Sequence, residues 1–530
     1  MNQVQRVVNP QSSGLADQLL TQVCERSPVV KRVLDNFGKV SLADYLQQTL
    51  VVSESPLQPR NDLLEVVYRY AESLLGQSVA EKVAQELEIF PAVMTANHHG
   101  VDFLAQSVQG SLTFSLRQVD GKPAKTVPVF ACGNVPLDNP TYPRGLLLYH
   151  SNRQAAEFRL PIRLPIFCNR YRRKLVSVVE AYDAEMLAQA ERRLAVMVRN
   201  RQVPLALATT VESVLGEDYR NSAVMGFENY SQQAVVLNNR LWKRCFREPE
   251  QAPEMIYLEL EKIASLLLQV DLNDEDSLAW QVMFNPTLRA QVLDQLDGVR
   301  ACWDRNKLFR RACLNPSDKE LNLSGCGTVF FWAINDAGWR VPLSLTGGAA
   351  CAALLQGRDD RGEFWTISFS QREILQGLQA GRLLPSLFSC FLTIAFARGI
   401  SCCGGYFQTD YLSAMQSGLV KVLQEKPGNA EIAARVSQVP SDIYLSGMQA
   451  VMRNLDDDLL LPAGLVEIIA SGGLSLSQLE QVRSLTVRDV HLAGLMETLP
   501  DFQSKEDRSD NWCLLLAKEN SRSLHNLTVI

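Results

Sequence analysis

The chain has 530 residues, of which 46% are hydrophobic and 21% are charged. This composition is ordinary for a globular protein and excludes long disorder, and the length predicts two to four packed units. The formal net charge of −6 gives no basic surface of the kind that nucleic acids or anionic membranes attract. We therefore expect small-molecule substrates, no nucleic acid and no membrane.

The sequence contains no recognisable targeting or membrane segment. Residues 1–6 have no apolar run behind them of the kind that a signal peptide needs, and the most apolar stretch, 387–397, is too short to span a bilayer. The twelve cysteines form no C-x-x-C pair, which indicates reduced thiols. These features predict a cytoplasmic protein.

In chain order, residues 1–88 have helical periodicity and are expected to form a helical N-terminal segment. Residues 89–169 begin an α/β core. The apolar runs 91–96 and 127–132 predict strands, and apolar residues recurring every four positions over 104–116 predict a helix between them. Because strand, helix and strand follow one another so closely, we expect two parallel strands joined by a crossover.

Residues 170–320 are expected to be a mostly helical insertion. The second part of the core, 321–415, again has residue patterns typical of β-strands, and its runs 328–332 and 339–343 predict a hairpin. Residues 416–530 are expected to be a helical C-terminal segment. The predicted fold is α/β, with a nucleotide-binding-like parallel-sheet core and helical N-terminal, inserted and C-terminal segments.

The strongest candidate site is the run 95–100, T-A-N-H-H-G, between the first predicted strand and its helix. Ligands of open α/β sheets bind at the carboxyl ends of strands, near the free N–H groups of helix starts. Two of the five histidines, His98 and His99, fall there, where they could bind a phosphate or carboxylate or transfer a proton. The alternative interpretation is a strand-end loop with surface histidines.

Known motifs containing these histidines fail on spacing. Condensation-type acyltransferases have H-H-x-x-x-D-G, but here Asp102 comes one residue early and Phe103 replaces the glycine. The membrane acyltransferase pattern H-x-x-x-x-D is also one residue too long. No cysteine or histidine spacing completes a zinc site, so no metal is expected. The sequence has no G-x-G-x-x-G, P-loop or G-x-S-x-G motif.

Two further segments have two readings each. The basic run 170–174 could bind phosphate or form a solvated helix start. The negative net charge of the whole chain favours the helix start. The segment 404–411 is a glycine turn followed by polar and aromatic residues, which fits either a binding loop or a tight turn into a helix. Although it lies about 300 residues beyond His98, we expect both to face one cavity, because such turns present N–H groups to the same anionic ligand.

The order of these features resembles that of the bacillithiol-synthesis cysteine-adding enzymes (BshC). Those enzymes have an early T-G-Q-Q-x-G motif followed by a helix, and 95–100 stands in that place. A strand resembling V-P-V-F-W-I-A and then E-D-H-D follow in the family. Here 127–130 reads V-P-V-F, and only Asp138 matches the acidic cluster. The family segment G-G-P-G-E-x-x-Y-W corresponds to 404–412, with Gln408 in place of the glutamate.

The resemblance implies a small-molecule biosynthetic enzyme, a ligase or transferase that forms a C–N bond between an amine and an amino acid or related carboxylate or thiol compound. The expected catalytic residues are His98, His99 and Asp138. The expected substrate-binding residues are Thr95, Asn97, Gly100, Asn134, Asn139, Arg144, Gly404, Gly405, Gln408 and Tyr411. A nucleotide, ATP or ADP, is left open as a cofactor, and a homodimer is left open as the assembly.

Two alternatives from other classes remain open. One is a nucleotidyltransferase-like enzyme that adenylates its substrate and releases pyrophosphate. The other is a catalytically inactive binding or scaffold protein of a biosynthetic pathway. Loss of the family's acidic residues favours the inactive protein, and the polar residues after each predicted strand oppose it.

Overall fold

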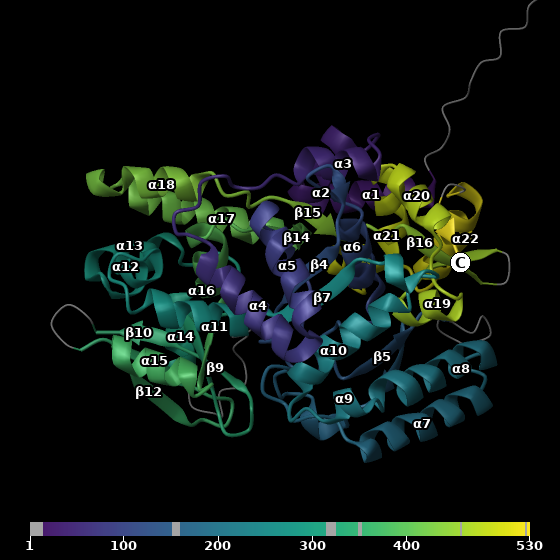
Figure 1. Ribbon diagram of the computed structural model, residues 1–530, viewed down its shortest axis with the longest axis horizontal. Helices are drawn as coiled ribbons and strands as arrows, with labels where there is room; N and C mark the ends of the chain where they lie inside the picture. The colour runs from purple at the N-terminus through teal and green to yellow at the C-terminus, as the bar shows by residue number, and fades with distance from the viewer. Residues whose placement is uncertain (1–13, 151–159, 314–324, 348–351, 456–457, 525–526) are drawn as a thin grey trace, which may run out of the picture.

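The computed structural model describes residues 14–150, 160–313, 325–347, 352–455, 458–524 and 527–530, so residues 1–6 lie outside the described chain. A five-stranded parallel sheet lies at its centre (Figure 1). Its strands are β1 (Ala92–Met94), β4 (Thr126–Ala131), β7 (Glu254–Glu259), β14 (Ser401–Gly405) and β15 (Tyr444–Ser446). The prediction that the segments around 91–96 and 127–132 form neighbouring parallel strands is confirmed.

The spatial order of the sheet is β15-β14-β1-β4-β7, and all neighbours are parallel. The first strand of the sheet along the chain is β1, which lies in the middle, and the next two, β4 and β7, lie successively further out on one side. The chain then returns to the other side of β1 for β14 and β15. The direction of winding therefore reverses between β1 and β14, and at such a point the loops that leave the two strands diverge and form a crevice.

Side chains of each strand alternate between two cores, one on each face of the sheet. Met94 belongs to the first core and Val93 to the second, as expected for successive residues of a strand. The first core is shared with α6 (Ala105–Ser115), which joins β1 to β4. The second is shared with α4 (Asn61–Leu75) and α5 (Gln77–Ile89).

Helix α6 is buried on all sides rather than along one stripe. Ten of its eleven residues are buried, because β4 and β15 pack on it and its Gln109 side chain forms hydrogen bonds with the backbone of Val451 and Ala463. A Cβ atom at Gly110 would lie 3.4 Å from the Ser446 Cα. The glycine therefore lets the helix approach the end of β15 closely.

The N-terminal helices α1 (Leu15–Arg26), α2 (Pro28–Phe37) and α3 (Leu42–Thr49) lie beside the C-terminal helices in Figure 1. The C-terminal elements are α17 (Tyr406–Gln424), η5 (Pro427–Asn429), α18 (Ala430–Ser437), β16 (Val451–Leu455), β17 (Leu459–Pro462), α19 (Leu465–Ala470), α20 (Leu476–Ser484), α21 (Val487–Phe502), α22 (Trp512–Ser523) and β18 (Thr528–Val529). This part of the chain is therefore not only helical, since it supplies β15 and a small three-stranded sheet.

The region 170–320 also contributes to the central sheet, so it is not simply a helical insertion. After the short strands β2 (Gln118–Val119), β3 (Lys122–Pro123), β5 (Gly145–Leu148) and β6 (Ile162–Pro165), the chain forms η1 (Asn169–Tyr171), α7 (Ala184–Arg199), α8 (Leu205–Ser213), η2 (Val214–Tyr219), α9 (Ser222–Met225), α10 (Tyr230–Lys243) and η3 (Pro249–Gln251). Strand β7 follows, and then α11 (Leu260–Asp271), α12 (Leu278–Phe284), α13 (Pro286–Gln295) and α14 (Arg305–Cys313).

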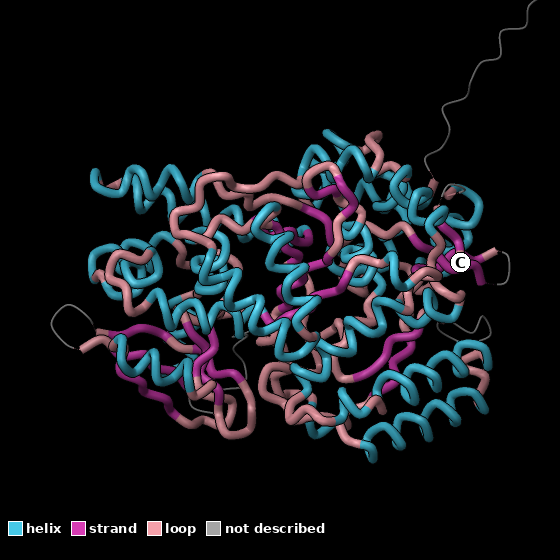
Figure 2. The backbone as a smooth tube through the Cα atoms, in the orientation of Figure 1, coloured by secondary structure: helices cyan, strands magenta, loops and turns pink. Residues whose placement is uncertain are grey.

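The predicted hairpin is present in a separate group of small sheets, which lies beside the central sheet at the lower left of Figure 2. Its elements are β8 (Phe331–Ile334), β9 (Arg340–Pro342), β10 (Ser344–Thr346), β11 (Leu354–Arg358), β12 (Phe364–Ser368), α15 (Gln371–Gln379) and β13 (Leu383–Pro385). The apolar stretch 387–397 forms the buried α16 (Leu387–Phe391) and η4 (Leu392–Ala397). Within the described residues, no helix is both long and apolar enough to span a bilayer.

Candidate functional site

At the switch point, the chain after β1 separates from β14. The Thr95 N–H still donates to the Cys403 carbonyl at 2.9 Å. Beyond it, the chain pairs only with the extension of β4. The Cys132 N–H donates to the Asn97 carbonyl at 2.9 Å, and the His99 N–H donates to the Cys132 carbonyl at 2.8 Å. The histidine segment therefore follows the β4 side of the switch point.

The glycine turn after β14 lies directly across this switch point. Helix α17 begins at Tyr406, and Gln408 in its first turn donates from Nε2 to the Thr95 Oγ1 at 2.5 Å. The structure thus joins two segments that lie more than 300 residues apart in the sequence. The Gln408 Oε1 is buried and has no hydrogen-bond partner among the described residues. Tyr411 lies one turn further along the helix and packs on Phe391 in the second core.

His98 is held as a neutral imidazole with a defined tautomer. Its Nδ1 lies 3.1 Å from the Asn139 Oδ1, and this oxygen can only accept, so Nδ1 carries the proton. The Thr141 N–H and hydroxyl donate to the same oxygen and fix its orientation. Burial lowers the pKa of His98, and the positive charge of Arg340 lowers it further. The other ring nitrogen, Nε2, is consequently an unprotonated acceptor.

His99 has a different environment and is a core residue. Its side chain is 0% exposed, and its Nε2 lies 2.9 Å from the Ser231 Oγ, which in turn donates to Glu259 at 2.6 Å. Burial lowers the pKa of His99 to about 4. Helix α6 begins only at Ala105, so neither histidine lies in its first turn, and burial rather than the helix dipole keeps both rings neutral.

A buried carboxylate, Glu261, organises the loop after β4. It accepts from the Gly133 N–H at 2.7 Å, from the Asn134 N–H at 3.1 Å and from the Cys132 thiol at 3.0 Å. These backbone groups would otherwise be free to bind an anion. Glu261 was not predicted because it lies in the first turn of α11, away from any recognised motif.

A cavity of about 590 Å³ lies beside these strand ends, between the core and the small sheets. We call it the arginine cavity. It is lined by Pro136, Asp138, Arg173, Leu175, Arg300, Ala301, Arg311, Gly325, Cys326, Gly327, Trp332, Trp339, Arg340, Pro342 and Asp360. Of the predicted site residues only Asp138 lines it, and Asp138 also lies 3.5 Å from Arg172 in an ion pair. Arg173 belongs to the basic run 170–174, but no pattern in the sequence indicated that Arg300, Arg311 and Arg340 would lie beside it.

Arg340 connects the cavity to the loop after β4. Its guanidinium donates to the Asn134 carbonyl at 2.9 Å and lies 4.7 Å from the centre of the Trp332 ring. Its side chain reaches solvent inside the concave cavity, where the surrounding protein lowers its pKa by desolvation. The loop residue Asn134 is buried, and its Oδ1 has no partner among the described residues.

Five other predicted residues have structural roles or lie apart. Gly100 has φ +120°, and a Cβ atom there would lie 2.7 Å from the Pro143 Cβ, so the position requires glycine. Asn97 is buried and donates to Asp102 at 3.1 Å. Arg144 donates to Asn169 at 3.0 Å and, among the described residues, forms no hydrogen bond or ion pair with the other predicted site residues. Gly404 and Gly405 complete β14, where Gln408 packs over Gly404.

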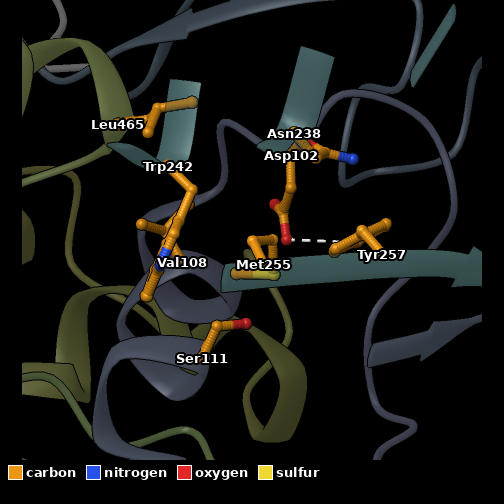
Figure 3. Close-up of a pocket in the computed structure, with 8 residues that line it drawn as sticks. All are labelled: Asp102, Val108, Ser111, Asn238, Trp242, Met255, Tyr257 and Leu465. Atoms are coloured by element: carbon orange, nitrogen blue, oxygen red, sulfur yellow. Dashed lines mark hydrogen bonds between the residues drawn. The ribbon is translucent and has the colours of Figure 1, made fainter. Parts of the chain in front are cut away.

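A second, much smaller cavity of about 20 Å³ lies under the histidine segment (Figure 3). Asp102 and Tyr257 face one another across it, with 3.2 Å between the hydroxyl and the Asp102 Oδ2. Desolvation raises the pKa of Asp102 to about 7. This volume has room for one water molecule and not for a substrate, so of these two cavities the arginine cavity is the candidate binding site.

No protein-family model, curated protein or solved structure matches this chain. Among the described residues, no group of three or more His, Cys, Asp or Glu side chains is arranged to hold a metal ion. The assignment of function therefore depends on the geometry of the site.

Proposed function

We propose that the chain is an enzyme that forms a C–N bond between an amine and a carboxylate- or thiol-bearing small molecule, with His98 as the proton acceptor. The observation that supports this proposal is the neutral His98 with a fixed tautomer, whose pKa is lowered by burial and by the charge of Arg340. The amine nitrogen attacks the carboxyl carbon, and the C–O bond of that carboxyl group breaks, its oxygen leaving as water or, where ATP activates the carboxylate, with the phosphate or AMP. The amine proton passes to the unprotonated imidazole nitrogen of His98, which accepts protons at neutral pH. Arg340 would hold an anionic group of the second substrate.

The arrangement of the core supports this proposal. The central strand with two strands on either side has the order of doubly wound, nucleotide-binding-like sheets, in which ligands bind where the winding reverses. Arg340 approaches from the β4 side, while Arg300 lies 3.7 Å from the ring centre of Phe407 in α17. The cavity thus borders both segments that resemble the cysteine-adding enzymes.

An inactive binding protein is the second candidate, and Glu261 favours it. In this chain a buried carboxylate occupies the backbone N–H groups after β4, and these groups would otherwise contribute to an anion site. The same contact also disfavours nucleotide binding in that loop. The arginine cavity remains open beside it, so binding without turnover is compatible with the geometry.

Mass spectrometry of the purified chain with mixtures of amines, amino sugars and amino acids including cysteine tests the proposal. Incubations with and without ATP are compared. We expect a condensation product, and we expect His98→Gln to lower its rate about a hundredfold or more, as for loss of a positioned base. Release of pyrophosphate from ATP would indicate adenylation instead, and absence of any product would indicate the binding protein.

The exposed variant Arg199→Gln serves as the control, because this residue is in the last turn of α7, far along the chain from the site. It should retain the parent rate. An unchanged rate in His98→Gln would contradict the assignment of His98 as the base, even if a product forms.

A further inference from the structure

The charges of the arginine cavity are not balanced within the described chain. Arg173 and Arg311 both form ion pairs with Asp360, and Asp138 pairs with Arg172 outside the lining. Arg300 and Arg340 have no carboxylate within ion-pair distance among the described residues. Burial raises the pKa of Asp501, and the charge of Arg300 only partly offsets this rise, while Asp501 accepts the Tyr406 hydroxyl. Within the part of the chain that the structure describes, two guanidinium groups of the cavity are therefore not neutralised.

The positions of these two arginines show that they are held toward a ligand. Each is stacked on an aromatic ring, Arg340 on Trp332 and Arg300 on Phe407. Stacking restricts a guanidinium and leaves its N–H groups at the edge free to bind. Arg340 contacts the loop after β4 and Arg300 contacts Phe407 in α17, so a ligand between them would lie between segments from both sides of the switch point.

We propose that the arginine cavity binds a phosphate-bearing small molecule through Arg300 and Arg340. This inference gives the class of the anionic substrate and so rests on the proposed function. A carboxylate has one charge and two oxygens, which a single arginine fork satisfies. A phosphate ester has about two negative charges and three terminal oxygens, which matches two arginines.

The lining supports phosphate over a simple anion in two further respects. All the cationic side chains of the lining are arginines and none is a lysine, and arginine is the residue that recognises phosphate bidentately. The volume of about 590 Å³ is in the range of cavities that hold a whole small molecule.

Isothermal titration of the full chain with inorganic pyrophosphate tests this proposal, with malonate at the same ionic strength as the carboxylate probe. We expect pyrophosphate to bind, and malonate to bind at least about tenfold more weakly. Arg300→Gln and Arg340→Gln should each weaken pyrophosphate about ten- to a hundredfold, the range for losing a charge-assisted hydrogen bond. Arg199→Gln should bind like the parent.

Three outcomes would overturn the phosphate assignment. These are no pyrophosphate binding at millimolar concentration, equal binding of malonate, or unchanged affinity in Arg300→Gln, whose exposed side chain makes misfolding a poor explanation. His98→Gln separates this inference from the proposed function, because it should bind pyrophosphate normally. Normal binding together with an unchanged condensation rate would leave the phosphate site standing and reject His98 as the base.

Discussion

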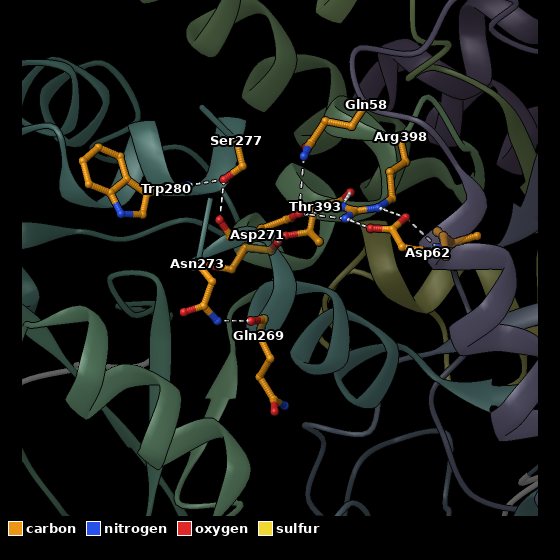
Figure 4. A network of polar contacts seen from close by, with 11 residues as sticks. Gln58, Asp62, Gln269, Asp271, Asn273, Ser277, Trp280, Thr393 and Arg398 are labelled. Atoms are coloured by element: carbon orange, nitrogen blue, oxygen red, sulfur yellow. Dashed lines mark hydrogen bonds and ion pairs between the residues drawn. The ribbon is translucent and has the colours of Figure 1, made fainter. Parts of the chain in front are cut away.

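Arginines lie at both edges of the central sheet, but they differ in burial and in ion pairing. Before β14, at the amino edge, Arg398 is fully buried between Asp62 and Asp271 (Figure 4). Its five N–H groups all have acceptors, including the Thr393 carbonyl at 2.9 Å. At the carboxyl edge, Arg300 and Arg340 have no carboxylate within ion-pair distance among the described residues.

The difference separates a structural cluster from a functional one. A buried charge is tolerated only when it is paired and hydrogen-bonded, and Arg398 meets this condition completely. Its two carboxylates come from α4 and α11, so the ion pairs join three separate parts of the chain. Arg300 and Arg340 reach solvent, which lets them remain without a partner until a ligand binds.

The largest expected effect is at the amino edge. Replacing Arg398 with Met leaves Asp62 and Asp271 close together without their shared cation, and removing one partner of a buried ion pair costs about 3–5 kcal/mol. Urea unfolding, followed by circular dichroism, measures this loss. A change below about 1 kcal/mol would show that the cluster does not stabilise the fold.

The two histidines give the next contrast, within the carboxyl edge itself. His99→Asn removes a fully buried ring that contacts Ser231, and we expect a loss of about 1–3 kcal/mol from the cavity and the lost hydrogen bond. His98→Asn should cost less than half as much, because that ring is only partly buried. The same unfolding experiment compares the two variants. Equal losses of unfolding free energy would contradict the assignment of His99 to the core and His98 to the site.

Buried carboxyl groups predict a loss of stability as the pH rises. The pKa is raised to about 7 by burial in Asp102, Glu259, Glu467 and Glu497. Below pH 7 the folded state holds protons that the unfolded chain releases near pH 4, so this contribution is lost as the pH rises toward 7 and beyond. Burial lowers the pKa values of His99 and His491 to about 4, so their effect on stability has the opposite sign. Their stabilising contribution is lost as the pH falls, and above about pH 6.5 it no longer changes with pH.

Between about pH 6.5 and 8 the carboxyl groups therefore act alone, and we expect the free energy of unfolding to fall by about 1 kcal/mol or more. Unfolding curves at several pH values measure the slope. Glu259→Gln should make the pH dependence of the unfolding free energy shallower, because the amide does not titrate but can still accept a hydrogen bond from Ser231. An identical slope in parent and variant would exclude Glu259 as a source.

The smallest effect is expected at the unpaired arginines. Arg300→Met should change the free energy of unfolding by less than about 1 kcal/mol, because only an exposed stacking contact with Phe407 is lost. This is the matched control for Arg398→Met, since the substitution is the same. A loss as large as that at Arg398 would mean that the arginine cavity is a structural cluster, and the comparison between the two edges would fail.

Periodicity in the sequence was sufficient to predict the β1-α6-β4 unit and the β8–β9 hairpin. It did not reveal β7, because Glu254–Glu259 continues into α11 without a turn residue and shares its apolar pattern. It also missed β15, which is only three residues long. Short buried strands and short helical segments have the same local pattern, and only packing distinguishes them.

The candidate site was predicted in part, for a similar reason. The position of His98 after a strand and the turn at Gln408 could be read locally. The burial of His99 depends on Ser231, more than 100 residues away, and the arginine cavity depends on how β9 packs against the loop after β4. No spacing in the sequence contains that information.

The central position of β1 has a consequence for synthesis of the chain. Its second neighbour, β14, begins at Ser401, more than 300 residues after β1 ends at Met94. At about 5–20 residues per second, the ribosome needs roughly 15–60 s to make the intervening chain. During that interval one edge of β1 presents unpaired backbone groups, the kind of edge that pairs with other chains. Production of this protein therefore depends on protection of the nascent N-terminal half until β14 emerges.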